Sequence, residues 1–288
     1  ALLELFGGDL LQGTVTSALF FGSPDVILFE RLGVDAAVMG NHELDYGQDV
    51  FRRLVGLARF PFLTATVQSD PEPLPVRPSV IVAKPGGPRV AVLGLTTPEL
   101  TTATHPRNVY GMSVEEPVAV ARRLVPDLAA GADLVVVLSH MGIADDRRLA
   151  REVPQIDLIV GGHNHNLYAE PVLEAGVAIL QAGERGRWLG RLDMDCRGGR
   201  LARAGYRTLS MDAAAPEDPE MAAEVARIAA EADLELTQTI GRSEVELSAS
   251  REEIRRGESA FGNFVADLAR ESTLADAGAR HAARAPGQ

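Results

Sequence analysis

One arrangement recurs along this chain: a short apolar run that ends in Asp, Asn or His. The runs have the length of β-strands, and such residues lie where strands of an open α/β sheet end at one edge. Four of the six histidines fall at these places. Imidazole nitrogens and carboxylate or amide oxygens are ligands for divalent cations. One metal centre explains the clusters better than four independent turns would, and the clusters are Gly8-Asp9, Gly40-Asn41-His42-Glu43 with Asp45, Ser139-His140 and Gly162-His163-Asn164-His165.

His163 and His165 form the sharpest local signal. In an extended segment alternate side chains project to one side, so both imidazoles would point the same way with Cα atoms roughly 6–7 Å apart. That separation suits two metal ions about 3.5–4 Å apart, with one imidazole on each. Gly161 and Gly162 would let the backbone pack close beneath the ions. The alternative is a polar turn whose histidines only cap a strand.

The other clusters have two readings each. The carbonyl of Asn41 is a hard oxygen donor, and His42 with Asp45 three residues later can form an acid with its orienting carboxylate; the alternative is an Asx-type turn. Ser139 and His140 are neighbours on a strand and point to opposite faces, so they are not a nucleophile–base pair. His140 is therefore a ligand or a strand-end cap. Asp9 either bridges two cations or is an ordinary turn residue.

Composition narrows the function. The net charge of −12 argues against binding to a nucleic-acid polymer, and any phosphate site must obtain its positive field locally, from metal ions. The single cysteine, Cys196, excludes an intrachain disulfide and a cysteine-based zinc site. The longest apolar runs are strand-sized, and we expect no transmembrane segment.

Alternating apolar and helical patterns predict an α/β (α+β) sandwich with mixed sheets inside and helices outside. Expected strands are Leu2–Phe6, Ala36–Met39, Phe62–Thr66, Val80–Ala83, Val90–Leu95, Leu134–Leu138 and Ile156–Val160, followed by shorter pieces at Ala178–Gln181, Gly186–Asp195, Leu201–Ser210 and Glu244–Leu247. Expected helices are Pro24–Leu32, Asp49–Arg59, Val114–Ala130, Asp145–Glu152, Glu220–Leu236 and one around Asn263–Arg270. The segment Ala275–Gln288 is expected to be disordered.

The clusters and their order give the chain a family resemblance. Their matching segments are Gly7–Gly13, Leu32–Ala36 running into Gly40–Gly47, Leu138–Gly142, Ile156–His165, Gln181–Gly183 and Leu189–Leu192. In these segments the chain resembles the calcineurin-like metallophosphoesterases, within them the 5′-nucleotidase / UDP-sugar hydrolase branch. The resemblance implies a four-layer α-β-β-α sandwich and hydrolysis of a phosphate ester, with a nucleotide as the expected substrate.

The resemblance also implies residue roles. The implied metal ligands are Asp9, Asn41, His140, His163 and His165. Asp9 would bridge two divalent ions, and His165 would belong to the second site. His42, oriented by Asp45, would stabilise the leaving-group oxygen while a metal-bound hydroxide attacks phosphorus in line. Zinc, manganese, cobalt and iron all suit such ligands.

The resemblance implies three segments: a catalytic domain over 1–212, a linker helix over 213–242 and the start of a substrate-binding C-terminal domain over 243–288. The family opens with a strand whose Asp and His complete the second metal site, and we expect this chain to begin after it. Glu258–Asp267 resembles the opening helix of the nucleoside-binding domain, so we expect truncation there too. A periplasmic or extracellular location is implied, and the sequence leaves the oligomeric state open.

Two other readings stay open. A non-catalytic metal-binding fragment would keep one fairly complete site. A thiosulfohydrolase-like branch has the same framework with different chemistry, although the intact Asn41-His42-Glu43 with Asp45 favours phosphate chemistry.

Overall fold

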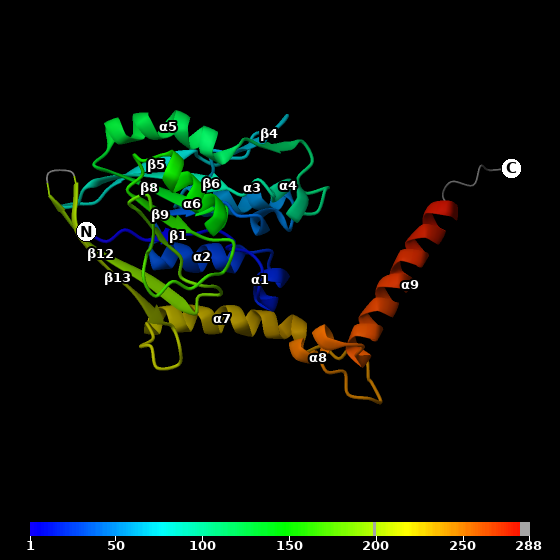
Figure 1. Cartoon of the computed structure of the whole chain (residues 1–288). Helices are drawn as coiled ribbons and strands as arrows, with labels where there is room; N and C mark the ends of the chain where they lie inside the picture. The colour runs from blue at the N-terminus through cyan, green and yellow to red at the C-terminus, as the bar shows by residue number, and fades with distance from the viewer. Residues whose placement is uncertain (198–199, 283–288) are drawn as a thin grey trace. The chain divides into compact units, whose positions relative to one another are not determined.

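Two β-sheets form the centre of the chain. The computed structural model describes residues 1–197 and 200–282, and the chain divides into two units, Ala1–Asp233 and Leu234–Gln288. The first unit contains both sheets (Figure 1). The smaller sheet is parallel, in the order β1-β2-β3. Its strands are β1 (Leu5–Phe6), β2 (Ala36–Val38) and β3 (Phe62–Leu63).

The larger sheet has six strands in the order β10-β11-β9-β8-β6-β5. The four central strands run parallel, and β10 and β5 are antiparallel edges. Both faces of a central strand such as β8 are buried, and for this reason its sequence is a nearly continuous apolar run. The strands are β5 (Ser79–Ala83), β6 (Arg89–Thr96), β8 (Leu134–His140), β9 (Leu158–Gly161), β10 (Val172–Glu174) and β11 (Val177–Leu180).

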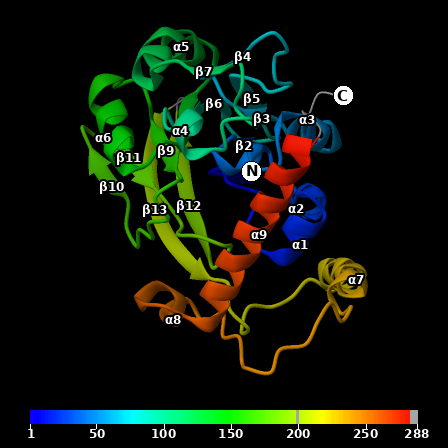
Figure 2. The ribbon, with the colours of Figure 1, turned by 90° about the vertical axis from the view of Figure 1, so that its right-hand side faces the viewer.

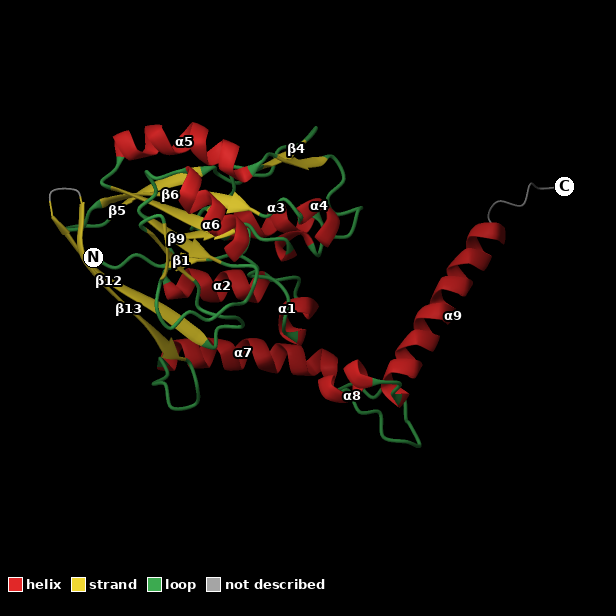
Figure 3. Ribbon diagram, viewed as in Figure 1, coloured by secondary structure: helices red, strands yellow, loops and turns green. Residues whose placement is uncertain are grey.

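Three buried apolar clusters define four layers in the first unit. One lies between the two sheets and joins Val38 and Leu63 to Val136 and Leu138. A second packs the outer face of the larger sheet against α5 (Pro117–Gly131) and α6 (Ile143–Glu152). The third packs the smaller sheet against α2 (Ser23–Leu32) and α3 (Gln48–Leu57). Helices therefore cover the outer face of each sheet (Figure 3), which confirms the predicted α-β-β-α sandwich.

Apart from the strand expected at Glu244–Leu247, the predicted elements are confirmed with shifted ends. The helical pattern expected from Val114 begins only at Pro117, because the Glu116 side chain caps the backbone N–H groups of Val118 and Ala119. Val114 instead ends β7 (Met112–Val114), which pairs with β4 (Val67–Ser69). Short elements of this size leave little periodic signal. Others without a predicted counterpart include α1 (Val15–Leu19), η1 (His42–Leu44) and α4 (Leu100–Ala103).

The first unit closes with a hairpin and a helix. β12 (Trp188–Arg197) and β13 (Arg200–Ser210) pair antiparallel. They are followed by α7 (Pro219–Leu236), whose buried Ile228 and Ala232 face the unit. Figure 2 shows the hairpin of β12 and β13, and it shows α6 beside the strands β10 and β11.

The second unit contains α8 (Arg251–Arg256) and α9 (Ala260–Ala282). The strand predicted at Glu244–Leu247 is wrong: the segment is irregular, and the described residues offer it no partner strand. Disorder predicted from Ala275 is also wrong as far as Ala282, because the alanine-rich sequence continues α9. Residues 283–288 lie outside the described part. Within the described chain no helix has both the length and the apolarity to cross a bilayer.

Candidate metal centre

The predicted clusters lie at the carboxyl ends of neighbouring strands. Asp9 follows β1, Asn41 follows β2, His140 ends β8 and His163 follows β9. Because β1 and β2 run parallel, as do β8 and β9, each pair of loops leaves the same edge of its sheet. The sandwich then brings the two edges together.

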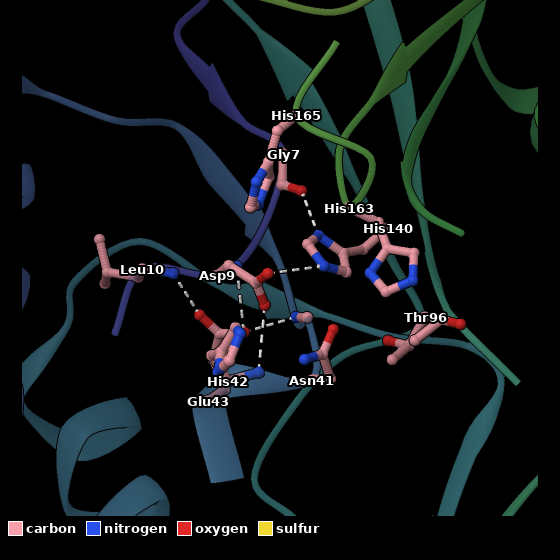
Figure 4. Close-up of polar contacts among 12 residues, drawn as sticks. Gly7, Asp9, Leu10, Asn41, His42, Glu43, Thr96, His140, His163 and His165 are labelled. Atoms are coloured by element: carbon pink, nitrogen blue, oxygen red, sulfur yellow. Dashed lines mark hydrogen bonds and ion pairs between the residues drawn. The ribbon is translucent and has the colours of Figure 1, made fainter. Parts of the chain in front are cut away.

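Asp9, His140 and His163 each offer a ligand atom, and these three atoms lie within 4.8 Å of one another. The rings of His140 and His163 have centroids 5.1 Å apart (Figure 4). Nε2 of His140 lies 3.1 Å from Oδ2 of Asp9, at ion-pair distance. The structure thus places three of the predicted ligands in one cluster.

The donor atoms in this cluster suit a divalent cation. Nδ1 of His140 donates to the carbonyl oxygen of Gly7 at 2.7 Å, so Nε2 carries the lone pair when the ring is neutral. Among the described residues, the buried Oδ1 of Asn41 has no hydrogen-bond partner, and the buried Nε2 of His140 has only the ion-pair contact with Asp9 at 3.1 Å. Buried polar atoms are normally satisfied. Nε2 of His140 and Oδ1 of Asn41 can each give an electron pair to a divalent ion, and both atoms lie beside the carboxylate of Asp9.

The protonation of the cluster follows from burial and mutual contact. Burial would raise the pKa of Asp9, but its contacts with His140 and His42 outweigh burial and lower it. Burial would lower the pKa of His140, but the hydrogen bonding and charge of Asp9 raise it. The pKa of His163 is lowered by burial and by the neighbouring His140. Without a bound cation, Asp9 and His140 therefore form a charged pair.

His42 and Asp45 form the predicted pair. Nδ1 of His42 lies 2.6 Å from Oδ2 of Asp45, and the His42 side chain is 43% exposed. Burial acts to lower the pKa of His42, but the hydrogen bond with Asp45 and the charge of Asp9 raise it. The backbone N–H of His42 also donates to Oδ1 of Asp9 at 3.1 Å, which ties the pair to the cluster.

Glu43 organises the loops and had no role in the sequence reading. Its buried carboxylate accepts the backbone N–H groups of Asp9, Leu10 and Gly40 at 3.2, 2.5 and 2.6 Å. Burial, together with the charge of Asp9, raises its pKa to about 7. A capping box would need Ser or Thr three residues before Glu43, where the chain has Gly40, so the local sequence gave no signal for this role.

Asp146 is a second buried carboxyl that the sequence reading missed. It accepts a short hydrogen bond from the hydroxyl of Ser139, while His140 faces Gly7 and Asp9. Neighbours on β8 therefore have partners on opposite faces, as predicted. Burial raises the pKa of Asp146 to about 7. The only sequence signal was a carboxylate in the first turn of a helix, which usually faces solvent.

The loop that carries His163 and His165 is not extended. Both residues have positive φ, 72° and 59°, so the expected alternation of side chains is wrong. The backbone turns there because Asn164 N–H donates to the carbonyl of Gly162 at 2.9 Å, and the Asn164 side chain accepts from Ile143 N–H at the start of α6. His163 joins the cluster, whereas Nδ1 of His165 pairs with Glu184 at 3.0 Å.

Close backbone packing is needed around the cluster. A Cβ on Gly40 would lie 2.2 Å from Oδ1 of Asp9, and one on Gly162 would lie 2.2 Å from the carbonyl of Gly7. Both glycines therefore permit the close approach of the loops.

The sandwich and its strand-end cluster of Asp and His side chains define a metal-dependent hydrolase class. A sequence model described as Calcineurin-like phosphoesterase matches residues 3–167, and the chain belongs to this family. It is 30% identical over 244 residues to Protein UshA of Yersinia enterocolitica, covering 74% of this chain and 44% of UshA.

Two solved structures from Thermus thermophilus are also similar. A 5′-nucleotidase precursor has a TM-score of 0.76 and 32% identity, covering 92% of this chain and 56% of that one. The sulfate thiohydrolase SoxB has a TM-score of 0.74 and 27% identity, covering 80% and 42% respectively. The chain spans less than half the length of the first curated relatives it matches.

Proposed function

We propose that this chain is the catalytic part of a metal-dependent phosphoester hydrolase that acts on nucleotides. The carrying observation is the cluster of Asp9, His140 and His163 beside the buried Oδ1 of Asn41, which is unpartnered within the described chain, a set of donor atoms that suits a divalent cation. The names of relatives support the substrate class, because several are 5′-nucleotidases. Relatives named as snake venom 5′-nucleotidases favour an extracellular or periplasmic setting.

We assign two divalent ions to the centre, with Asp9 shared between them. Asn41, His140 and His163 would complete one site, and His165, which lies outside the three-residue cluster, would belong to the other. Bound ions would supply Lewis acidity to the phosphate group and activate water.

In this proposal His42 is the general acid that protonates the leaving-group oxygen. Asp45 holds the Nδ1–H of His42, so a protonated ring presents its Nε2–H outward. The raised pKa of His42 increases the protonated fraction near neutral pH. That proton passes from Nε2 to the leaving-group oxygen as the P–O bond breaks.

The test is His42→Ala, assayed with a nucleoside 5′-monophosphate and Mn²⁺. We expect turnover to fall roughly 10²–10⁴-fold, the range for a positioned acid, with unchanged bound metal. The matched control is His105→Ala, an exposed histidine outside the clusters. Equal turnover in wild type and His42→Ala would remove His42 from the mechanism.

The likeness to SoxB, named a sulfate thiohydrolase, supports a second candidate, the thiosulfohydrolase-like chemistry. The His42–Asp45 pair favours the phosphate reading. Parallel assays of both substrate classes decide between them, and bound metal without turnover on either would favour a non-catalytic metal-binding fragment.

A further inference from the structure

Glu184 lies opposite His165 because the two flanking segments pair antiparallel. Leu167 and Ala182 form an antiparallel bridge, and the N–H of Gly183 donates to the carbonyl of Asn166 at 2.9 Å. Continuing this register by two residues places Glu184 beside His165. The Gln181 side chain also accepts the Asn166 N–H at 3.1 Å. The backbone position of Glu184 opposite His165 therefore follows from this pairing.

The Glu184 carboxylate contacts one particular nitrogen of His165. Oε2 lies 3.0 Å from Nδ1 of His165 and 3.9 Å from Nε of Arg185. The imidazole contact is the shorter, so Arg185 is the weaker competitor for this oxygen. A carboxylate at Nδ1 keeps the ring proton there and leaves the lone pair on Nε2.

We propose that Glu184 is a positioning residue that holds His165 in its Nδ1–H tautomer, leaving Nε2 as the nitrogen that faces a divalent ion. The claim that Nε2 faces a divalent ion rests on the proposed function. The claim that Glu184 fixes the tautomer of His165 does not. Partners at the far nitrogen of a metal-bound histidine fix its tautomer and ring orientation, and their loss typically costs 10–100-fold in metal affinity.

His140 also has its partner at Nδ1, through a hydrogen bond, whereas Nδ1 of His165 and Oε2 of Glu184 lie at ion-pair distance. Nδ1 of His140 donates to the Gly7 carbonyl, which also leaves Nε2 free. His163 differs, because the carboxylate contact of this ring is at Nε2 and not at Nδ1. Nε2 of His163 lies 3.6 Å from Oε2 of Glu99, which is beyond normal hydrogen-bond length. Glu184 is thus the side chain through which the tautomer of a candidate ligand can be changed by mutation.

The contact is too exposed to serve folding. The side chains of His165 and Glu184 are 53% and 34% exposed, and exposed ion pairs contribute little to stability. A merely structural Glu184 would therefore leave both the tautomer and the metal affinity of the protein unchanged when it is removed.

The experiment records long-range ¹H–¹⁵N spectra of the full 288-residue chain after chelator treatment, at a pH where the imidazoles are neutral. His165→Asn assigns the His165 signals. We expect Nδ1–H in the wild type and a shift toward Nε2–H, the form favoured by a free histidine in water, in Glu184→Ala. The control Glu152→Ala removes a comparably exposed carboxylate, 31%, whose partners are Arg122 and Arg148 on helices.

Mn²⁺ titration of the same proteins provides the second readout. We expect affinity to fall 10–100-fold in Glu184→Ala and to be unchanged in Glu152→Ala. An unchanged His165 tautomer in Glu184→Ala would overturn the proposal, whatever the titration shows. If the tautomer shifts but the wild type binds no Mn²⁺, the orienting role of Glu184 stands and the proposed metal function fails.

Discussion

Besides Asp45, the partner of His42, four carboxylates surround the candidate centre without being among its expected ligands, and they differ sharply in burial. Glu43 and Asp146, the base carboxylates, are 1% and 2% exposed. Glu99 and Glu184, the rim carboxylates, have side chains 69% and 34% exposed. The base carboxylates bind backbone and hydroxyl groups, and the rim carboxylates contact imidazoles. The base therefore holds the loops in place, while the rim contacts individual rings, of which we propose that Glu184 orients His165.

Removing Glu43 gives the largest expected effect. Glu43→Ala leaves the N–H groups of Asp9, Leu10 and Gly40 without their acceptor, at about 1–3 kcal/mol for each buried donor. We expect the free energy of unfolding to fall by several kcal/mol in urea titrations. Glu217→Ala, at an exposed position, should leave it within about 0.5 kcal/mol of wild type. A loss no larger than this control would show that Glu43 does not hold the loops.

Asp146 should make stability depend on pH. Its folded pKa of about 7 exceeds the ordinary value of 3.8, so between these values the folded state binds more protons than the unfolded state. Unfolding free energy therefore decreases as pH rises from about 4 to 7. Asp146→Asn keeps an acceptor for Ser139 and removes this dependence.

We expect the stability of Asp146→Asn relative to wild type to increase over that range by at most roughly 4 kcal/mol. Chelator-treated protein, unfolded in urea at several pH values, provides the measurement. Asp127→Asn, on the exposed face of α5, serves as the control. Parallel pH profiles for Asp146→Asn and wild type would mean that Asp146 titrates normally.

The rim should give the smallest change in stability. Glu184→Ala removes only exposed ion pairs, so the free energy of unfolding should stay within about 0.5 kcal/mol of wild type. The same urea titrations measure it. A loss comparable to that of Glu43→Ala would erase the distinction between base and rim.

The sandwich and much of the centre could be predicted from sequence, for physical reasons. Buried strands such as β8 are continuous apolar runs, and their ends are marked by polar ligand residues such as His140. The close pairing of His42 with Asp45 followed from a spacing of three residues.

What sequence could not show depended on tertiary contacts. The turn at His163 and His165 arises from Asn164 bonding to the start of α6, a long-range contact invisible to local periodicity. The burial of Asp146 likewise depends on which face of α6 packs against the sheet. The predicted domain limits and residue roles remain predictions.

The most direct test of the central claim is the divalent-ion content of the purified chain after Mn²⁺ loading and desalting, compared between wild type and His140→Ala. The account predicts at least one ion per wild-type chain, held at the cluster of Asp9, His140 and His163, and the loss of one ion in His140→Ala, with no loss in His105→Ala. Equal ion content in wild type and His140→Ala would contradict the assignment of this cluster as a metal centre.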